Sequence, residues 1–251
     1  MTSQRAALIA HRGASRVSPE NTLHAFAQAL ADGADGLECD LRLSLDGEPI
    51  IFHDADLMRL TGHHGQLAEK PWSELRHLTI RGAGEGAPHT IPHLRDLVAL
   101  VAQRPSTSPR LIINVELKPI KAHLPLVTAC RPHLEALARS SDLVLSSFDP
   151  RVLAAFAVVP LSGPHRLGLL FEDLNGLAAL RFLPTAVYDL HPEASLLTDA
   201  THAAWSSPGR RFRAWTVDDP IVARRLLTLD PTIALITNRP GPLAAELEEA
   251  S

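Results

Sequence analysis

The sequence predicts an α/β fold, a TIM-type (β/α)8 barrel, on three observations. Short apolar runs that suit buried strands alternate with runs whose apolar residues recur every three or four positions, as in amphipathic helices. There are eight strand-like runs, which is the number that such a barrel requires. The chain length of 251 residues is also typical of this fold.

The strand-like runs cover most of the chain at regular intervals. They lie at residues 7–11, 36–44, 110–118, 143–148, 166–171, 186–191, 211–217 and 232–238. Most of the intervening segments read as helices, and several open with Asn, Asp or Pro, which suit a helix start. Glu20, Asn21 and Thr22 precede the first helix, with Asn21 or Thr22 as its cap; hydrogen bonding within a functional site is an alternative role for Glu20 and Asn21. A doubly wound open sheet is the alternative fold, but the turn after the first strand lacks the Gly-x-Gly-x-x-Gly phosphate loop.

One stretch interrupts the repeat. Residues 49–53 form a ninth strand candidate, and residues 54–92 are rich in Gly and His without sustained periodicity. We therefore expect a β-hairpin excursion after the second strand, followed by a small insertion at about 54–92 that covers the mouth of the active site. The whole chain, 1–251, is expected to form a single barrel domain. The histidines of this region, including His63, His64, His89 and His93, are expected in solvated loops.

Composition and charge exclude several classes of partner. The net charge of −4 provides no long-range attraction for nucleic acid or for an anionic membrane, so we expect neither nucleic-acid binding nor stable membrane association. The apolar stretch Ala6–His11 is too short for a signal-peptide core or a membrane span, which predicts a cytoplasmic protein. Cys39 and Cys130 show no metal-ligand spacing and are expected as buried small hydrophobes. A homo-oligomer is compatible with this composition.

The segment LECDLRLSLDGEPIIFHD, residues 37–54, predicts a hairpin that carries charge. Strand alternation places Glu38 and Asp40 on one face, and Asp46-Gly47 is a strong hairpin signal. A two-residue turn there would pair Leu45 with Glu48 and would set His53 opposite Asp40. Buried carboxylates need compensation, so positive groups are expected beside them.

Other strand ends carry the expected positive groups. His11 and Arg12 follow the first strand, while Glu116 and Lys118 share a face at the end of the third. Catalytic groups of TIM barrels sit at the carboxyl ends of the strands, so these side chains are expected to converge on one mouth.

Here the chain resembles a known family. The fragments are HRG (11–13), PENT (19–22), GLECD (36–40), SLDG (44–47), HD (53–54), NVELK (114–118), SSF (146–148), HP (191–192), AWTV (214–217) and ITNRP (236–240). In this order and over nearly the whole chain they resemble the glycerophosphodiester phosphodiesterase family, in particular bacterial members without a secretion signal. Asn238 stands where the family usually has Asp, which leaves the anchoring of the last strand open.

The resemblance implies hydrolysis of a small-molecule glycerophosphodiester, such as glycerophosphocholine or glycerophosphoethanolamine, to sn-glycerol 3-phosphate and an alcohol. It also implies a divalent cation held by carboxylates. Glu38, Asp40 and Glu116 form an all-oxygen set that suits Mg2+ or Ca2+, with Mn2+ a further option. Zinc is disfavoured, because no Cys or His joins the set at ligand spacing.

The remaining site residues match the needs of phosphodiester cleavage. His11 and His53 fit the acid and base roles, which imidazoles fill near neutral pH, and the resemblance implies that they exchange roles between two steps. Arg12 matches the phosphate-binding arginine of the family, and Lys118 adds a charge that balances the acids. By resemblance Trp215 lines the glycerol pocket, although core packing suits it equally.

Two alternative functions stay open. A lysophospholipase D-type enzyme on the same scaffold would accommodate an acyl chain in a long apolar groove, but the insertion offers few large hydrophobic residues, which read as packing residues. The other alternative is a catalytically silent barrel that binds phosphodiesters. This is disfavoured because no catalytic histidine or metal carboxylate is missing.

Overall fold

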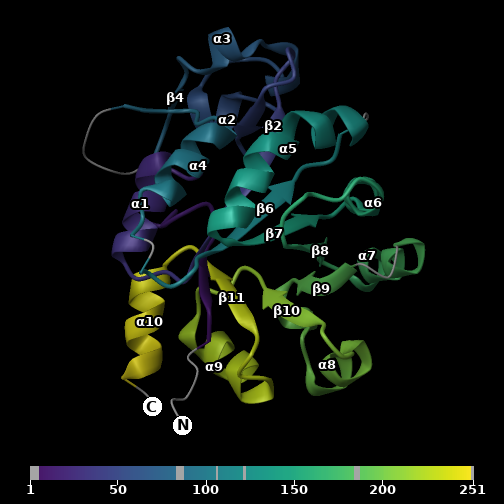
Figure 1. Ribbon diagram of the computed structural model, residues 1–251. Helices are drawn as coiled ribbons and strands as arrows, with labels where there is room; N and C mark the ends of the chain where they lie inside the picture. The colour runs from purple at the N-terminus through teal and green to yellow at the C-terminus, as the bar shows by residue number, and fades with distance from the viewer. Residues whose placement is uncertain (1–5, 83–87, 106, 121–122, 184–186, 250–251) are drawn as a thin grey trace.

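The computed structural model describes residues 6–82, 88–105, 107–120, 123–183 and 187–249 (Figure 1). Its strands are β1 (Leu8–Ala10), β2 (Gly36–Leu43), β3 (Pro49–Ile51), β4 (Thr79–Ile80), β5 (His89–Thr90), β6 (Ile112–Leu117), β7 (Asp142–Ser147), β8 (His165–Phe171), β9 (Val187–Pro192), β10 (Arg211–Ala214) and β11 (Ala234–Thr237).

A closed parallel barrel forms the centre of the molecule. The main sheet has nine strands in the order β1-β11-β10-β9-β8-β7-β6-β2-β3, and an additional parallel pairing of β1 with β2 closes it. Among the described strands of this sheet, only β3 is antiparallel, and it extends β2 as the return strand of a hairpin. Each of the predicted strand runs corresponds to one strand of the closed ring. The (β/α)8 barrel is therefore confirmed, and the open doubly wound sheet is wrong.

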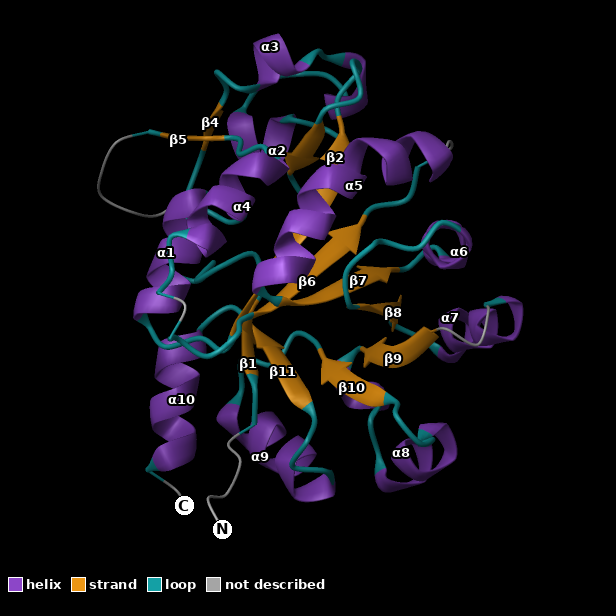
Figure 2. Cartoon of the chain, in the orientation of Figure 1, coloured by secondary structure: helices purple, strands orange, loops and turns teal. Residues whose placement is uncertain are grey.

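Helices surround the barrel (Figure 2). They are α1 (Leu23–Ala31), α2 (Met58–Thr61), α3 (Trp72–Leu75), α4 (Leu94–Ala102), α5 (His123–Ser140), α6 (Pro150–Val158), α7 (Leu174–Leu177), α8 (Asp199–Trp205), α9 (Pro220–Leu229) and α10 (Pro240–Glu248), with 3-10 turns at Leu67–Glu69, Ala178–Phe182 and Ala194–Leu196. Thr22 caps α1, since its side chain accepts a hydrogen bond from the Ala25 N–H, as one of the two predicted caps. Helix α8 was not expected, because its short sequence DATHAAW carries little apolar periodicity.

The hairpin of β2 and β3 forms with a different register from the predicted one. Leu43 pairs with Pro49 and Leu41 with Ile51, so the Phe52 N–H, rather than that of His53, donates to the Asp40 carbonyl. The turn is one residue longer than predicted. Ser44 and Glu48 close it through their backbone groups, and Gly47 takes the left-handed conformation at φ 82° that a three-residue loop requires.

The insertion, which lies beside α4 at the top of Figure 1, has a small apolar core of its own. This core contains Ile50, Phe52, Leu57, Leu60, Leu67, Leu75, Ile80 and Ile91. In the observed register Phe52 lies opposite Asp40 and joins the core of the insertion, whereas its neighbour Ile51 points the other way into the main core.

The histidines of this region divide into two groups. His63 and His64 are exposed, as expected, whereas His89 is half-buried in β5 and stacks on the ring of His24. His93 is not a solvated loop residue: it is 1% exposed, its ring bonds Glu48 at 2.9 Å, and it caps α4 in a capping box with Asp96. The expectation failed because histidine is an uncommon cap and the pattern of the flanking residues did not indicate one.

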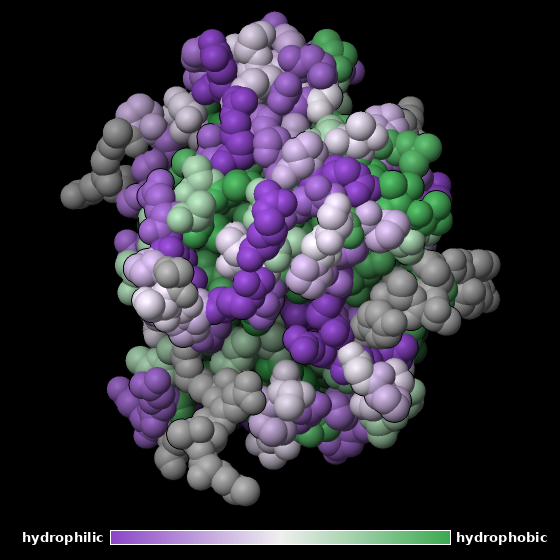
Figure 3. All heavy atoms as spheres, in the orientation of Figure 1, coloured by the Kyte–Doolittle hydropathy of each residue, from purple (hydrophilic) through white to green (hydrophobic). Residues whose placement is uncertain are grey.

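The main hydrophobic core lies between the outer face of the barrel and its helices. Cys39 and Cys130 are both buried in it as free thiols, which confirms their expected packing role. Hydrophobic and hydrophilic side chains are interspersed over the face seen in Figure 3. Within the described ranges, no helix combines the length and the apolar character needed to cross a membrane.

Candidate active site

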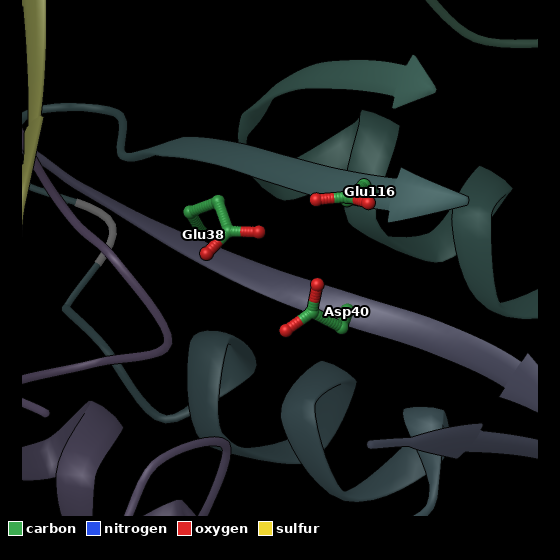
Figure 4. A group of neighbouring side chains, drawn as sticks. All are labelled: Glu38, Asp40 and Glu116. Carbon is green, nitrogen blue, oxygen red and sulfur yellow. The ribbon is translucent and has the colours of Figure 1, made fainter. Parts of the chain in front are cut away.

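Three buried carboxylates form the centre of the site (Figure 4). Glu38 and Asp40 project from β2, and Glu116 projects from the neighbouring strand β6, where it is the register partner of Asp40. Because alternate residues of a strand share a face, all three enter the barrel interior. One carboxylate oxygen from each residue lies within 4.8 Å of those of the other two.

The turn after β1 brings Arg12 onto these carboxylates. The backbone N–H of Arg12 donates to Glu38 Oε2 at 2.9 Å, and the side-chain Nε of Arg12 lies 3.1 Å from Asp40 Oδ2. This geometry requires left-handed backbone at Arg12 (φ 56°) and Gly13 (φ 82°). A Cβ at Gly13 would lie 2.6 Å from the Ala25 carbonyl carbon, so glycine also permits α1 to approach the turn.

Lys118 occupies the other side of the carboxylates. Its Nζ lies 2.7 Å from Asp40 Oδ1 and 2.5 Å from Glu116 Oε1, and the residue is 8% exposed. Although burial acts to raise the pKa of Asp40, the charges of Lys118 and Arg12 hold that pKa below its usual value. Asp40 is therefore the carboxylate that stays ionised.

The charged forms of the other two carboxylates, Glu38 and Glu116, are less stable than that of Asp40. Burial together with the charge of Asp40 raises the pKa of Glu38 well above its usual value, and the same two causes raise the pKa of Glu116 to about 7. Arg12 and Lys118 thus supply two positive charges against three acidic groups. A divalent cation would supply the missing charge, and the all-oxygen donors suit a hard ion. The residues present therefore fit the implied metal.

His11 is oriented by a chain of hydrogen bonds from the end of β11. Its Nδ1 lies 2.7 Å from Asn238 Oδ1, and Asn238 Nδ2 donates to Asp218 Oδ2 at 2.6 Å. Because an amide oxygen can only accept, Nδ1 carries the proton and Nε2 is left as the acceptor. Burial, followed by the charge of Arg12, lowers the pKa of His11 to about 4, so the ring is neutral at pH 7.

His53 is held in a similar way by its neighbour in sequence. Its Nδ1 lies 2.6 Å from Asp54 Oδ1, and its carbonyl accepts from Arg42 Nε at 2.8 Å. Burial lowers the pKa of His53, while the charge of Asp40 acts against this shift. His53 thus reaches the neighbourhood of Asp40 after leaving β3, and not as its cross-strand partner.

Trp215 lies at the end of β10, half-buried at the mouth. Its Nε1 donates to the His191 carbonyl at 2.7 Å, and its ring meets Phe148 edge-on with centroids 5.5 Å apart. The His191 ring is fully buried, and neither of its nitrogens has a hydrogen-bond partner among the described residues. The structure thus brings together seven of the eight residues predicted for the site, at the ends of β1, β2 and β6 and after β3. The eighth, Trp215, follows β10 and contacts His191 and Phe148 instead.

Four residues with contacts in this site were not assigned a definite role from sequence. Asn21 donates to Asp40 Oδ2 at 2.7 Å, and Glu20 accepts from Arg12 Nη1 at 3.0 Å, contacts that were considered only as an alternative to helix initiation. Asn238 was noted only as a departure from the family, yet it bonds His11. Asp54 was quoted in the HD doublet, and an acid directly after a histidine is the signal that could have identified it.

Comparisons with known proteins agree with this geometry. The sequence model of the glycerophosphoryl diester phosphodiesterase family matches residues 11–242. A glycerophosphodiester phosphodiesterase of Bacillus altitudinis is 30% identical over 228 residues, which cover 88% of this chain and 90% of the relative.

Solved structures share the fold over almost the whole chain. An Oleispira antarctica phosphodiesterase, solved with the product sn-glycerol-3-phosphate, superposes with a TM-score of 0.81 at 25% identity and covers 97% of both chains. A glycerophosphodiester phosphodiesterase of Thermotoga maritima gives a TM-score of 0.73 at 25% identity, covering 96% of this chain and 98% of its own. From the site geometry, the family match and these relatives together, the chain belongs to the glycerophosphoryl diester phosphodiesterase family.

Proposed function

We propose that this protein hydrolyses glycerophosphodiesters, such as glycerophosphocholine or glycerophosphoethanolamine, to sn-glycerol 3-phosphate and an alcohol in a metal-dependent reaction. The observation that carries the proposal is the buried group of Glu38, Asp40 and Glu116, within 4.8 Å of one another and flanked by Arg12 and Lys118. These three carboxylates would hold Mg2+, Ca2+ or Mn2+. When bound, the ion would neutralise phosphate charge and lower the pKa of a coordinated hydroxyl.

Charge balance supports a phosphodiester as the substrate. Three carboxylates, one arginine, one lysine and one divalent cation sum to a single positive charge, which a phosphodiester monoanion would neutralise. Arg12 offers a planar fork to two phosphate oxygens. Lys118 offsets the negative charge of Asp40 and Glu116 and so reduces their repulsion of the phosphate. Trp215 and Phe148 would form the apolar wall on which the glycerol carbons pack.

His11 and His53 would carry the protons. In the first step, the glycerol hydroxyl next to the diester attacks phosphorus; one imidazole takes its proton, and the other gives a proton to the departing alcohol. Water then opens the resulting cyclic phosphate, with the two imidazoles in exchanged roles. In each ring Nδ1 is bonded to a neighbouring oxygen, which leaves Nε2 free to exchange protons with the substrate.

An acylated substrate is the second candidate. It would need an apolar groove, but the large hydrophobic residues of the insertion mostly pack into their own core, including Leu57, Leu60, Leu67, Leu75 and Ile80. This favours a small headgroup diester over a lysophospholipid. The free thiols Cys39 and Cys130 agree with the reducing conditions of the cytoplasm, which we propose as the compartment.

The test is release of sn-glycerol 3-phosphate from glycerophosphocholine by the purified protein. Release should disappear in EDTA and return with one of Mg2+, Ca2+ or Mn2+. His11→Ala and His53→Ala should lower turnover by about 10²- to 10⁴-fold. Both should keep the wild-type circular dichroism spectrum, and His63→Ala, an exposed histidine of the insertion, should match wild type in turnover.

Other outcomes would redirect the assignment. Faster turnover of lysophosphatidylcholine than of glycerophosphocholine would move the substrate class to acylated diesters. No product from either substrate with any of the three ions, while a folded protein still binds the diester, would favour the silent barrel.

A further inference from the structure

Arg59 joins the insertion to the active site. It lies in α2, and its side chain is 50% exposed. Its Nε and Nη2 donate to the two oxygens of Asp54 at 2.6 and 2.9 Å. Its Nη1 and Nη2 donate to the two oxygens of Glu20, both at 2.9 Å. One guanidinium therefore forms a two-bond fork to each of two carboxylates.

Each of these carboxylates holds a residue of the proposed machinery. Asp54 Oδ1 lies 2.6 Å from His53 Nδ1, and Glu20 Oε1 accepts from Arg12 Nη1 at 3.0 Å. The hydrogen bonds thus run from the proposed catalytic histidine through Arg59 to the proposed phosphate-binding arginine. The two ends of this chain come from different parts of the fold, since Glu20 lies in the β1–α1 loop, 39 residues before Arg59.

The position of Arg59 is fixed by packing and not by these ion pairs alone. Leu57, two residues before Arg59, and Leu60, directly after it, are buried in the core of the insertion at 0% and 4% exposure. The backbone N–H of Met58 donates to Asp56 Oδ1 at 2.7 Å. The backbone of α2 is therefore anchored independently of Glu20 and Asp54, so that Arg59 presents its donors from a supported element.

We propose that Arg59 is a positioning residue for the reaction proposed above, on which this inference rests. It sets the ring orientation of His53 through Asp54 and the direction of the Arg12 guanidinium through Glu20, so that both meet the same phosphate. Without Arg59, the Glu20 and Asp54 carboxylates lose their shared cation and repel each other. The insertion is then a supporting part of the active site.

The effect on catalysis should exceed the effect on stability. A half-exposed ion pair contributes little to folding, because solvent screens it. Misplacement of a catalytic group by about 1 Å can cost about 10²-fold in rate. We therefore expect Arg59→Ala to remain folded and to lose about 10- to 100-fold in kcat, with a smaller rise in KM. Arg59→Lys keeps the charge but not the fork, so its kcat should fall between those of Arg59→Ala and wild type.

Kinetics on glycerophosphocholine would compare these variants with Arg110→Ala. Arg110 is a matched control because it is 48% exposed and forms an ion pair with Asp142 at 2.9 Å. It precedes β6, whereas Lys118 of the site follows β6, so Arg110 lies at the opposite end of that strand from the site. It should keep wild-type kcat and KM. Guanidinium ions at millimolar concentration should restore part of the kcat of Arg59→Ala and leave Arg110→Ala unchanged.

A second readout does not depend on turnover. The ring 15N resonances of His53, assigned by their loss in His53→Ala, should show the Nδ1-protonated tautomer in wild type and a shift toward a mixture in Arg59→Ala. An inactive wild type would refute the proposed function, but these resonances would still report on Arg59. Wild-type kcat in folded Arg59→Ala or in Arg59→Lys, or an unchanged His53 tautomer, would overturn the inference. If Arg59→Ala does not fold, Arg59→Gln takes its place in the same comparison.

Discussion

Replacing Lys118 with methionine tests whether the carboxylates of the site depend on its charge. Lys118 Nζ lies 2.7 Å from Asp40 Oδ1 and 2.5 Å from Glu116 Oε1, and only 8% of the residue is exposed. Methionine has similar length and keeps the apolar contacts of the side chain. The change therefore removes charge from a buried cluster without opening a large cavity.

The expected loss of stability follows from these distances. At 2.7 Å, one ion pair in a medium of effective dielectric constant about 20 is worth about 6 kcal/mol before desolvation of the ammonium, which costs several kcal/mol. Removing one partner of a buried pair typically costs about 3–5 kcal/mol. We expect Lys118→Met to lower the free energy of unfolding by this amount at pH 8 in EDTA.

The loss should depend on pH and on metal. The pKa of Glu116 is raised to about 7, so Glu116 is ionised at pH 8 and protonated at pH 5.5. Lys118 then has one fewer charged partner at pH 5.5, and the destabilisation should be smaller there. A divalent cation that binds only the folded state should restore stability at pH 8, by an amount that grows with its concentration.

Urea unfolding followed by tryptophan fluorescence measures these differences. Lys70→Met is the control, because Lys70 forms a partly exposed pair with Glu74 at 3.4 Å and should change stability by at most about 0.5 kcal/mol. A free energy of unfolding for Lys118→Met within about 1 kcal/mol of wild type at pH 8 in EDTA would refute the reasoning.

Three further predictions concern the turn after β1 and the barrel interior. Gly13→Ala should cost about 2–4 kcal/mol of stability in urea unfolding, because its Cβ would meet the Ala25 backbone at 2.6 Å in left-handed backbone. The pKa of His11 is lowered from 6.5 to about 4 in the folded state, so acidification protonates this residue in the unfolded chain first and destabilises the fold. Between pH 7 and pH 4, His11→Asn should therefore lose about 3 kcal/mol less of its free energy of unfolding than wild type loses. An equal loss in both proteins contradicts this. Gly168→Ala should lower the midpoint of thermal unfolding, because its Cβ would lie 2.4 Å from Nε2 of buried His191; an unchanged midpoint would show that the ring can move.

The sequence determined the barrel and the composition of its site. Alternating periods of two and of three to four residues were enough for the strand order, because each period reflects which face of an element is buried. The positions at strand ends then implied convergence of Glu38, Asp40 and Glu116, because all carboxyl ends of a parallel barrel open on one side.

Tertiary structure decided how these residues are held. The hairpin register differed by one residue, because Gly47 supports a three-residue loop where the Asp-Gly doublet suggested two. His93 became a buried cap because the path of the insertion brings Glu48 within 2.9 Å of its ring. Neither feature has a local sequence period.

Local sequence patterns also do not indicate which residues orient the histidines. Asn238 reaches His11 because β1 and β11 are neighbours in the closed ring, although 227 positions separate the two residues. Arg59 meets Glu20 only because the insertion packs back over the β1–α1 loop. The sequence by itself therefore determined the acidic, basic and imidazole groups proposed for the chemistry, through the burial pattern that each segment carries locally, but not the residues that orient them. Their orientation and charge state were decided only when barrel closure brought distant segments into hydrogen-bonding distance in a buried, low-dielectric interior.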